Sequence, residues 1–189
     1  MAQKRKNWNG LISGFKASDL VFLDGSGCNT DMTRRYAYSL GGSRAVDSAP
    51  LSKPKNTTIL SSIQLDGTLR YTTFSGGTTV ERFKRYLETD LLPHLNGNSV
   101  LIMDDMKSHH AKAVRNLLDS SGVRYIYLPP YSPDLNPIEK LWSKVKSFLR
   151  KFKARTLDAL PNAIQCAFQT VSPSDCSGWF HSCGYSPYF

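Results

Sequence analysis

Residues 128–146, LPPYSPDLNPIEKLWSKVK, decide how the second half of this chain folds. Pro129, Pro130 and Pro133 each fix their own φ and disfavour helical geometry in the residue before them, so we expect no helix ahead of residue 136. Beyond that point apolar residues recur at steps of three and four, which predicts an amphipathic helix of about four turns. The apolar stripe comprises Ile138, Leu141, Trp142, Val145, Leu149 and Phe152.

The start of this helix has two interpretations. Asn136 suits the N-cap, Pro137 suits the first helical position and Glu139 falls at the third. This is the asparagine version of a capping box, in which the glutamate reaches back to the amide of the cap residue. Alternatively, the proline-rich approach holds Glu139 as a functional carboxylate. The local sequence leaves both interpretations open.

The excess of basic over acidic residues indicates which class of partner the protein binds. The chain has 24 Lys and Arg against 15 Asp and Glu, a formal net charge of +9 and a pI near 9.5. Between residues 139 and 155 all charged residues but Glu139 are basic, and a second basic group stands at residues 4–6. This imbalance is typical of a protein that binds a polyanion, and we expect nucleic acid. The candidate DNA contacts are Lys140, Lys144, Lys146, Arg150, Lys151 and Lys153.

Length and patterning predict one domain with three parts. Residues 1–18 are polar, basic and broken by glycine, like a linker; residues 19–171 form the domain proper; residues 172–189 form an irregular tail. No apolar run approaches the length that crosses a membrane, and Trp8 to Gly10 interrupt any signal-like segment. We therefore expect a soluble, cytoplasmic protein.

The four cysteines do not form a recognisable metal-binding pattern. Cys28 stands alone, and Cys166, Cys176 and Cys183 are too irregularly spaced for a zinc ribbon. Together with His181 they could make a metal site, but reduced, partly buried thiols are the favoured interpretation.

The order of predicted elements indicates an α/β fold. Strands are expected at 20–24, 57–65, 69–74, 99–104 and 123–128, with a hairpin turn at Asp66-Gly67 and a further extended segment at 34–40. Helices are expected at 78–92, capped by Thr78, at 108–118, capped by Ser108, from 137, and at 156–170. An antiparallel start followed by alternating helices and strands predicts a mixed sheet with helices on both faces.

Three acids occupy the positions where such a sheet forms sites. Asp24 ends the first strand, Asp104 ends the buried strand at 99–104, and Glu139 opens the helix after the last strand. Three clustered carboxylates repel one another unless a cation neutralises them. Hard oxygen ligands suit Mg²⁺ or Mn²⁺, and two such ions can promote attack on a phosphodiester. The predicted chemistry is metal-assisted phosphoryl transfer on nucleic acid.

These stretches also resemble a known family. Leu128 to Glu139, Val21 to Asp24, Leu101 to Asp104 with His109 five residues on, and the closing Trp179 to Tyr185 are similar to the DDE transposases of bacterial insertion sequences in the mariner superfamily. Thirty-four residues separate Asp104 from Glu139, which is the interval of that family. The resemblance runs from about residue 18 to 185 and implies the ribonuclease-H-like fold shared with retroviral integrases.

The resemblance implies a function for each acid. Asp24, Asp104 and Glu139 would be the triad that holds two Mg²⁺ or Mn²⁺ ions. His109 matches the family motif and is a candidate accessory residue, but a histidine in the first turn of a helix is more often structural or solvated, and both interpretations stay open. The reaction would be DNA strand cleavage at element ends followed by strand transfer into target DNA, at TA dinucleotides. The partners would be double-stranded DNA and a second copy of the chain in a homodimer, in the cytoplasm with the nucleoid.

Three departures from the family keep alternatives open. Gly25 stands where glutamate is frequent, Asp105 stands where asparagine is usual, and only about eighteen residues precede the first strand. A separate helix-turn-helix polypeptide could therefore read the element ends. The alternatives are a ribonuclease-H-type nuclease and an inactive DNA-binding relic of a transposase.

Overall fold

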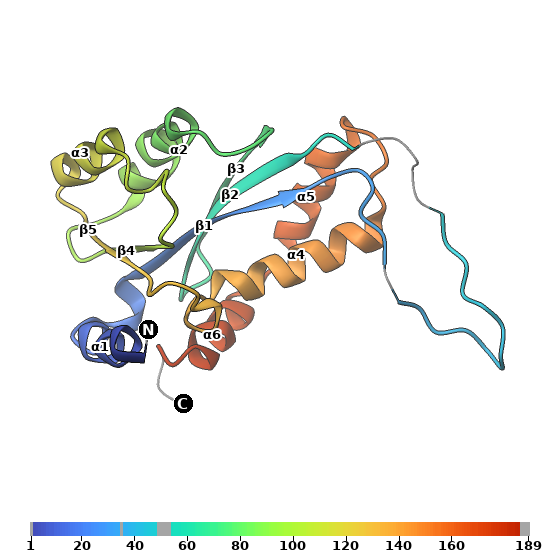
Figure 1. The fold of residues 1–189 in the computed structure, drawn as a ribbon, viewed down its shortest axis with the longest axis horizontal. Coiled ribbons are helices and arrows are strands. Elements are labelled where there is room, and N and C mark those ends of the chain that lie inside the picture. The colour runs from blue at the N-terminus through green and yellow to red at the C-terminus, as the bar shows by residue number, and fades with distance from the viewer. Residues whose placement is uncertain (1, 35, 49–53, 186–189) are drawn as a thin grey trace.

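A computed structural model describes residues 2–34, 36–48 and 54–185, and a five-stranded sheet in the order β3-β2-β1-β4-β5 lies at its centre (Figure 1). The first strand runs antiparallel to the second and parallel to the fourth, and the fourth runs parallel to the fifth. This is the mixed sheet that the sequence predicted. The strands are β1 (Leu20–Cys28), β2 (Thr57–Gln64), β3 (Leu69–Ser75), β4 (Val100–Met103) and β5 (Arg124–Tyr127).

Helices cover both faces of the sheet, as expected (Figure 1). Alternate residues of each strand point to opposite faces, so Phe22 and Ile102 pack on one side and Val21 and Leu101 on the other. The first cluster is covered by α4 (Ile138–Phe152), α5 (Ala159–Gln169) and α6 (Pro173–Ser182). The second is covered by α2 (Val80–Tyr86), which continues as a π-helical and a 3₁₀ turn to His94, and by α3 (Lys112–Ser121).

The linker-like start was predicted wrongly for residues 2–12. They form α1 (Ala2–Ile12), in which Trp8 and Ile12, four residues apart on one face, are buried in the core. The Nε1–H of Trp8 donates to the hydroxyl of Tyr185 at 3.0 Å, far along the chain. Tertiary contact therefore stabilises a helix whose own sequence, with Gly10 near its end, favours helix weakly.

The C-terminal segment also contains more structure than expected. Instead of an irregular tail, residues 173–182 form α6, which opens with a capping box between Ser172 and Asp175. Cys176 and Phe180 lie buried on its inner face, and Phe180 meets Phe22 of β1 edge to face at 5.3 Å. This packing supplies the free energy that a short, glycine-containing helix lacks alone.

Several local predictions need correction. Thr79 rather than Thr78 caps α2, and α3 begins at Lys112 after Ala111, so Ser108 is not its cap. The described residues among 34–40 form no strand. The Asp66-Gly67 hairpin is confirmed, with Gly67 at φ +91. No helix within the described part of the chain is long and apolar enough to span a bilayer.

Candidate active site

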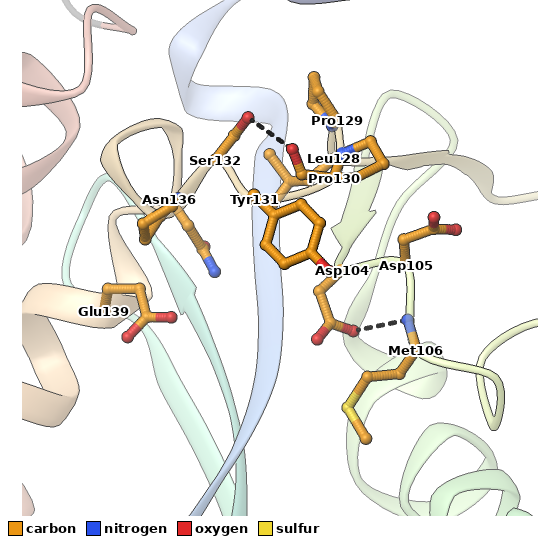
Figure 2. A pocket seen from close by; sticks show the side chains of 11 residues that line it. Asp104, Asp105, Met106, Leu128, Pro129, Pro130, Tyr131, Ser132, Asn136 and Glu139 are labelled. Carbon is orange, nitrogen blue, oxygen red and sulfur yellow. Dashed lines mark hydrogen bonds between the residues drawn. The ribbon is translucent and has the colours of Figure 1, made fainter. Parts of the chain in front are cut away.

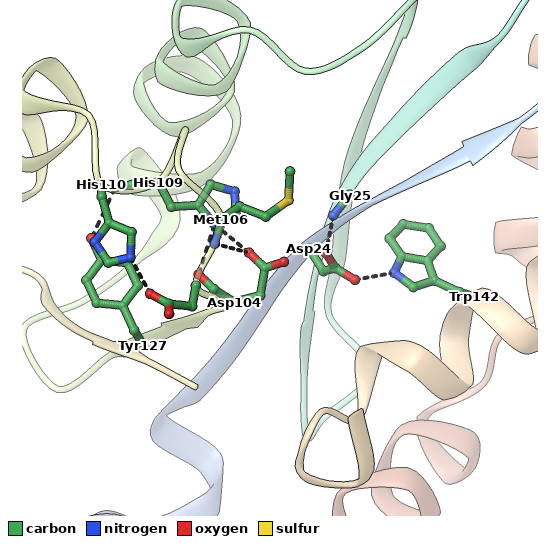
Figure 3. Close-up of polar contacts among 9 residues, drawn as sticks. Asp24, Gly25, Asp104, Met106, His109, His110, Tyr127 and Trp142 are labelled. Carbon is green, nitrogen blue, oxygen red and sulfur yellow. Dashed lines mark hydrogen bonds and ion pairs between the residues drawn. The ribbon is translucent and has the colours of Figure 1, made fainter. Parts of the chain in front are cut away.

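Strand register brings Asp24 and Asp104 together. Leu23 of β1 pairs with Met103 of the parallel strand β4, so the two aspartates occupy the next register position on neighbouring strands. Side chains at one register position of adjacent strands point to the same face of a sheet. Figure 3 shows both carboxylates turned toward the same region. The predicted convergence of these two residues therefore follows from two hydrophobic strands aligned in parallel.

Asp24 lies inside a strand rather than at its end. β1 continues to Cys28, and the Asp24 side chain is buried beneath α4, at 8% exposure. Its Oδ2 accepts a hydrogen bond from Nε1 of Trp142 at 2.9 Å and its Oδ1 accepts one from the amide of Gly25 at 2.6 Å (Figure 3). The position predicted for the strand end was wrong, but the carboxylate is held by two donors.

Burial raises the pKa of Asp24 to about 6, because desolvation disfavours its charged form. The negative charges of Asp104 and Glu139 raise it further, while the hydrogen bonds from Trp142 and Gly25 act in the opposite direction. The three acids therefore interact electrostatically.

Asp104 follows β4 directly and is more open to solvent, with its side chain 34% exposed. Its Oδ1 accepts from the amide of Met106 at 3.3 Å and lies 2.7 Å from Nδ1 of His109. The His109 ring is buried and stacks on Phe83, with 4.2 Å between ring centroids. Because His109 is fixed by packing, it can hold the Asp104 carboxylate in one orientation.

Asp105 belongs to a different contact. Its Oδ1 lies 2.5 Å from Nε2 of His110, whose ring packs on Tyr127 at 4.1 Å. The carboxylates of Asp104 and Asp105 point in different directions (Figure 2). Each aspartate thus has a histidine five residues later, and the two pairs diverge.

Glu139 faces Asp104 across a pocket of about 430 Å³ (Figure 2). The proline-rich segment forms one wall, and its first residue is anchored beside the site, since the amide of Leu128 donates to the carbonyl of Met103 at 2.8 Å. The exposed Glu139 side chain extends from the first turn of α4. The stiff segment therefore carries Glu139 from the edge of the sheet to a position opposite Asp104.

The capping interpretation of Glu139 is wrong. α4 begins at Ile138, and no side chain caps it. The amide of Asn136 donates to the carbonyl of Pro133 at 3.1 Å, which closes a 3₁₀ turn, and the Asn136 carbonyl accepts from the amide of Glu139. Asn136 is buried at 5% exposure, and its Oδ1 has no hydrogen-bond partner within the described chain. The glutamate side chain is thus left for another task.

The donor set suits a hard divalent cation, since it consists of carboxylate oxygens alone. Asp24, buried and made harder to ionise by two neighbouring acids, is the side chain that a cation would stabilise most. In residues 2–34, 36–48 and 54–185, no three His, Cys, Asp or Glu side chains are gathered closely enough to hold an ion. Asp104 and Glu139 both line the pocket, whereas Asp24 is not among its lining residues.

The six candidate DNA contacts are divided over α4 and its end. Lys146 and Arg150 line a polar pocket of about 490 Å³ beside the end of β1, while Lys140 and Lys151 line an open groove of about 810 Å³ between α4 and α6. Lys144 lies in this groove too but pairs with Asp175 at 2.5 Å, and Lys153 pairs with Asp47 at 2.6 Å.

Arg155, the last basic residue in the segment 139–155, holds the loop that follows β1. The Arg155 guanidinium donates to the carbonyls of Thr30 and Met32 at 3.2 and 3.3 Å. Its role is therefore structural.

Earlier in β1, a Cβ added at Gly25 would lie 3.0 Å from Cδ2 of Leu60, so the larger residue frequent in the family would crowd β2 here.

The thiols lie apart from this site. All four cysteines are free; Cys28, Cys176 and Cys183 are buried and Cys166 is half-buried. Burial raises the pKa of the Cys176 thiol to about 11, and a protonated thiol is a poor nucleophile and a poor metal ligand.

Comparison with known proteins defines the class. A family model described as DDE superfamily endonuclease matches residues 19–161, and the chain belongs to this family. The Tc1 transposable element transposase of Caenorhabditis elegans is 28% identical over 97 residues, which are 49% of this chain and 36% of that protein.

Solved structures of the Mos1 transposase share the fold. A pre-cleavage Mos1 transpososome superposes with a TM-score of 0.81 at 20% identity, over 95% of this chain and 58% of the Mos1 chain. The catalytic domain of Mos1 mariner transposase superposes with a TM-score of 0.68 at 15% identity, over 96% and 86%. The expected ribonuclease-H-like fold is thereby confirmed. The chain spans little more than half of the full Mos1 chain and about a third of Tc1 transposase.

Proposed function

We propose that this chain is the catalytic part of a mariner-type transposase, encoded by a bacterial insertion sequence, which cleaves DNA at element ends and joins them to target DNA at TA sites. The observation that carries the proposal is the placement of Asp24 and Asp104 at one register position, with Glu139 facing Asp104 across the pocket. Membership of the DDE endonuclease family and similarity to Tc1 transposase support it.

The proposed reaction has two steps at phosphorus. In the first, a water oxygen bonds to phosphorus and the water loses a proton, while the bond from phosphorus to the 3′ oxygen breaks and this 3′ oxygen takes up a proton. In the second, the oxygen of the released 3′-hydroxyl bonds to a target phosphorus and the hydroxyl loses its proton, while the bond to the 3′ oxygen of the target breaks and that displaced oxygen takes up a proton. Both are in-line displacements that require positioning and stabilisation of charge rather than a protein nucleophile.

Asp24, Asp104 and Glu139 would hold two Mg²⁺ or Mn²⁺ ions. When bound, such ions polarise phosphoryl oxygens and favour ionisation of the attacking hydroxyl. Mos1 structures are described as paired-end complexes with Mn and with Mg, which supports the same metals here. Trp142 would fix the orientation of Asp24, and His109 that of Asp104, through the contacts described above.

DNA would be held mainly through its phosphates. Lys146 and Arg150 continue the stripe of α4 that carries Trp142, and Lys140 and Lys151 lie on another side of the helix. Such contacts position a duplex without reading its sequence, so binding should be salt-dependent and nearly non-specific. Lys144 and Lys153 must first leave Asp175 and Asp47, and should contribute less.

The active assembly would be a homodimer on two DNA ends, with a separate helix-turn-helix polypeptide supplying sequence recognition. The paired-end complexes of Mos1 support the dimer. The match to 86% of the Mos1 catalytic domain supports assigning this chain the chemical step.

Cleavage of labelled duplex DNA with Mg²⁺ or Mn²⁺, with and without EDTA, tests the proposal. We expect nicked and joined products that disappear in chelator. Full activity in EDTA would contradict the metal mechanism. An RNA–DNA hybrid run in parallel decides against a ribonuclease, because cleavage restricted to the RNA strand would place the chain in that class. Inactivity on both substrates would favour the DNA-binding relic.

A further inference from the structure

Asn136 sits in the wall of the candidate active site without a structural task for its side chain. Its backbone is fixed on both sides, since its amide donates to Pro133 and its carbonyl accepts from Glu139. The hydroxyl of Tyr185 donates to the carbonyl of Leu135 at 2.5 Å, which anchors the preceding residue. The Asn136 carboxamide therefore extends from a backbone fixed by hydrogen bonds, and it takes no part in capping α4.

The orientation of this carboxamide is specific. Its Oδ1 is buried without a partner in the described chain, whereas the amide nitrogen points into the pocket, between Glu139 and Asp104 in the view of Figure 2. A buried carbonyl oxygen without a donor destabilises the folded chain, because it has lost its hydrogen bonds to water. Such a cost in a folded protein calls for an explanation, and a functional role for the other end of the amide is one.

The chemistry of the pocket supplies that role. The charged side chains in its lining are all acidic, namely Asp104, Asp105 and Glu139, and its lining contains no Lys, Arg or His. A phosphodiester that entered would bring further negative charge to these acids. The hydroxyl of Ser132 is directed to the carbonyl of Pro130 at 3.4 Å, so the Asn136 amide is the buried side-chain donor aimed at the pocket.

We propose that the Asn136 amide donates a hydrogen bond from Nδ2 to a non-bridging oxygen of the reacting phosphate. This contact rests on the function proposed above and adds a substrate-binding residue to the three carboxylates. Charge on the non-bridging oxygens is redistributed as phosphorus changes partners, so a fixed donor stabilises the transition state without reorganising. The partnerless Oδ1 is the structural cost of holding the donor in this direction.

The decisive experiment compares Asn136→Ala with Asn136→Asp. Alanine removes the whole carboxamide, whereas aspartate keeps its shape and its Oδ1 but replaces the Nδ2–H donor with a charged oxygen. At saturating DNA and Mg²⁺ we expect the alanine variant to lose about 10²–10³-fold in strand-transfer rate, the range measured for a lost oxyanion donor. The aspartate variant should lose more of the strand-transfer rate. The affinity of both variants for DNA, measured without divalent metal, should stay close to that of the unaltered chain.

A control separates this contact from a structural role. Asn116, exposed on α3 on the other face of the sheet, receives the same two substitutions and should leave the rate unchanged. The thermal midpoint Tm of the metal-free Asn136→Ala protein should be unchanged or raised, because a buried oxygen without a partner is removed.

Each contrary outcome has its own meaning. An aspartate variant as active as the unaltered chain would overturn the donor assignment while leaving the transposase proposal intact. A clearly lowered Tm for Asn136→Ala would show that the side chain is structural. An unaltered chain that is inactive on DNA with both metals would instead overturn the proposed function.

Discussion

The two halves of the candidate site provide their aspartates in contrasting ways. On the β1–α4 side, Asp24 is buried in a continuing strand, held by Trp142 and Gly25, and has its pKa raised to about 6. On the β4–α3 side, Asp104 follows the end of its strand, is about one-third exposed, and contacts His109. One carboxylate is thus immobilised and reluctant to ionise, and the other is accessible and oriented by a ring.

This contrast indicates how the folded chain accommodates Asp24, Asp104 and Glu139 in one region. Three ionised carboxylates in one place would repel, and the fold reduces that repulsion by burying Asp24, exposing Asp104 and setting Glu139 across a pocket. A bound divalent cation would neutralise the repulsion among the three carboxylates. Asp24 should therefore lose its proton, and the side chains should move closer, when metal binds.

The largest expected effect concerns the residue that joins the two halves. Glu139→Gln should reduce DNA cleavage and strand transfer by several powers of ten, as expected when a metal ligand is lost. Its Tm without metal should stay unchanged, since Glu139 makes no capping bond to α4. Rates and thermal melts of the same preparation check this. A lower Tm with a normal rate would restore the capping interpretation.

Asp24 should make the stability of the metal-free protein depend on pH. Its pKa is raised from 3.8 to about 6 on folding, so its favourable contribution is complete below pH 3.8 and is lost as pH rises through 6. The shift corresponds to about 3 kcal/mol of unfolding free energy at neutral pH. Asp24→Asn should therefore gain stability relative to the unaltered chain between pH 4 and 8.

Urea unfolding at several pH values measures this difference. The control is Asp119→Asn on α3, an exposed aspartate in the other half of the molecule, which should show no comparable trend. Addition of Mg²⁺ at pH 8 should stabilise the unaltered chain more than Asp24→Asn. A stability difference that does not change with pH would contradict the burial of an ionisable Asp24.

His109 sharpens the Asp104 half of the comparison. His109→Gln should weaken activation by Mg²⁺ about 10–100-fold, the usual cost of losing a partner that orients a metal ligand. His110→Gln is the matched control, because His110 contacts Asp105 instead. The concentration of Mg²⁺ at half-maximal activity is the readout. Equal shifts in the two variants would mean that neither histidine serves Asp104 specifically.

A smaller effect is expected where the Asp24 half continues along α4. Lys146→Ala with Arg150→Ala should make the slope of log K against log salt concentration shallower by about 1.8, because two phosphate contacts are lost. Between 50 and 200 mM salt the unaltered chain should therefore lose about tenfold more affinity for DNA than the variant. Lys112→Ala with Arg115→Ala on α3 removes the same charges from the other half and should change the slope little. Fluorescence anisotropy with an arbitrary duplex measures both. Equal salt dependence of the unaltered chain and the Lys146→Ala, Arg150→Ala variant would mean that these two side chains do not contact the DNA phosphates.

The sequence predicted the parts of the site that depend on local pattern. Unbroken apolar runs place β1 and β4 in the sheet, and the acids at 24 and 104 follow from them. The contact between Trp142 and Asp24 was missed because it joins residues 118 apart, although Trp142 lies one turn beyond Glu139. α1 and α6 were missed for a similar reason, since both depend on distant packing. The Asn136 cap failed because a 3₁₀ turn already used its backbone groups.

The most direct test of the account is the strand-transfer rate of Asp104→Asn and Asp105→Asn, measured side by side at saturating Mg²⁺. The neighbouring aspartates carry the same charge but contact different histidines, and Asp104 is the one that faces Glu139 across the pocket. We predict a loss of several powers of ten for Asp104→Asn and a rate near normal, or raised, for Asp105→Asn. Loss of activity in Asp105→Asn with retention in Asp104→Asn would contradict the site described here.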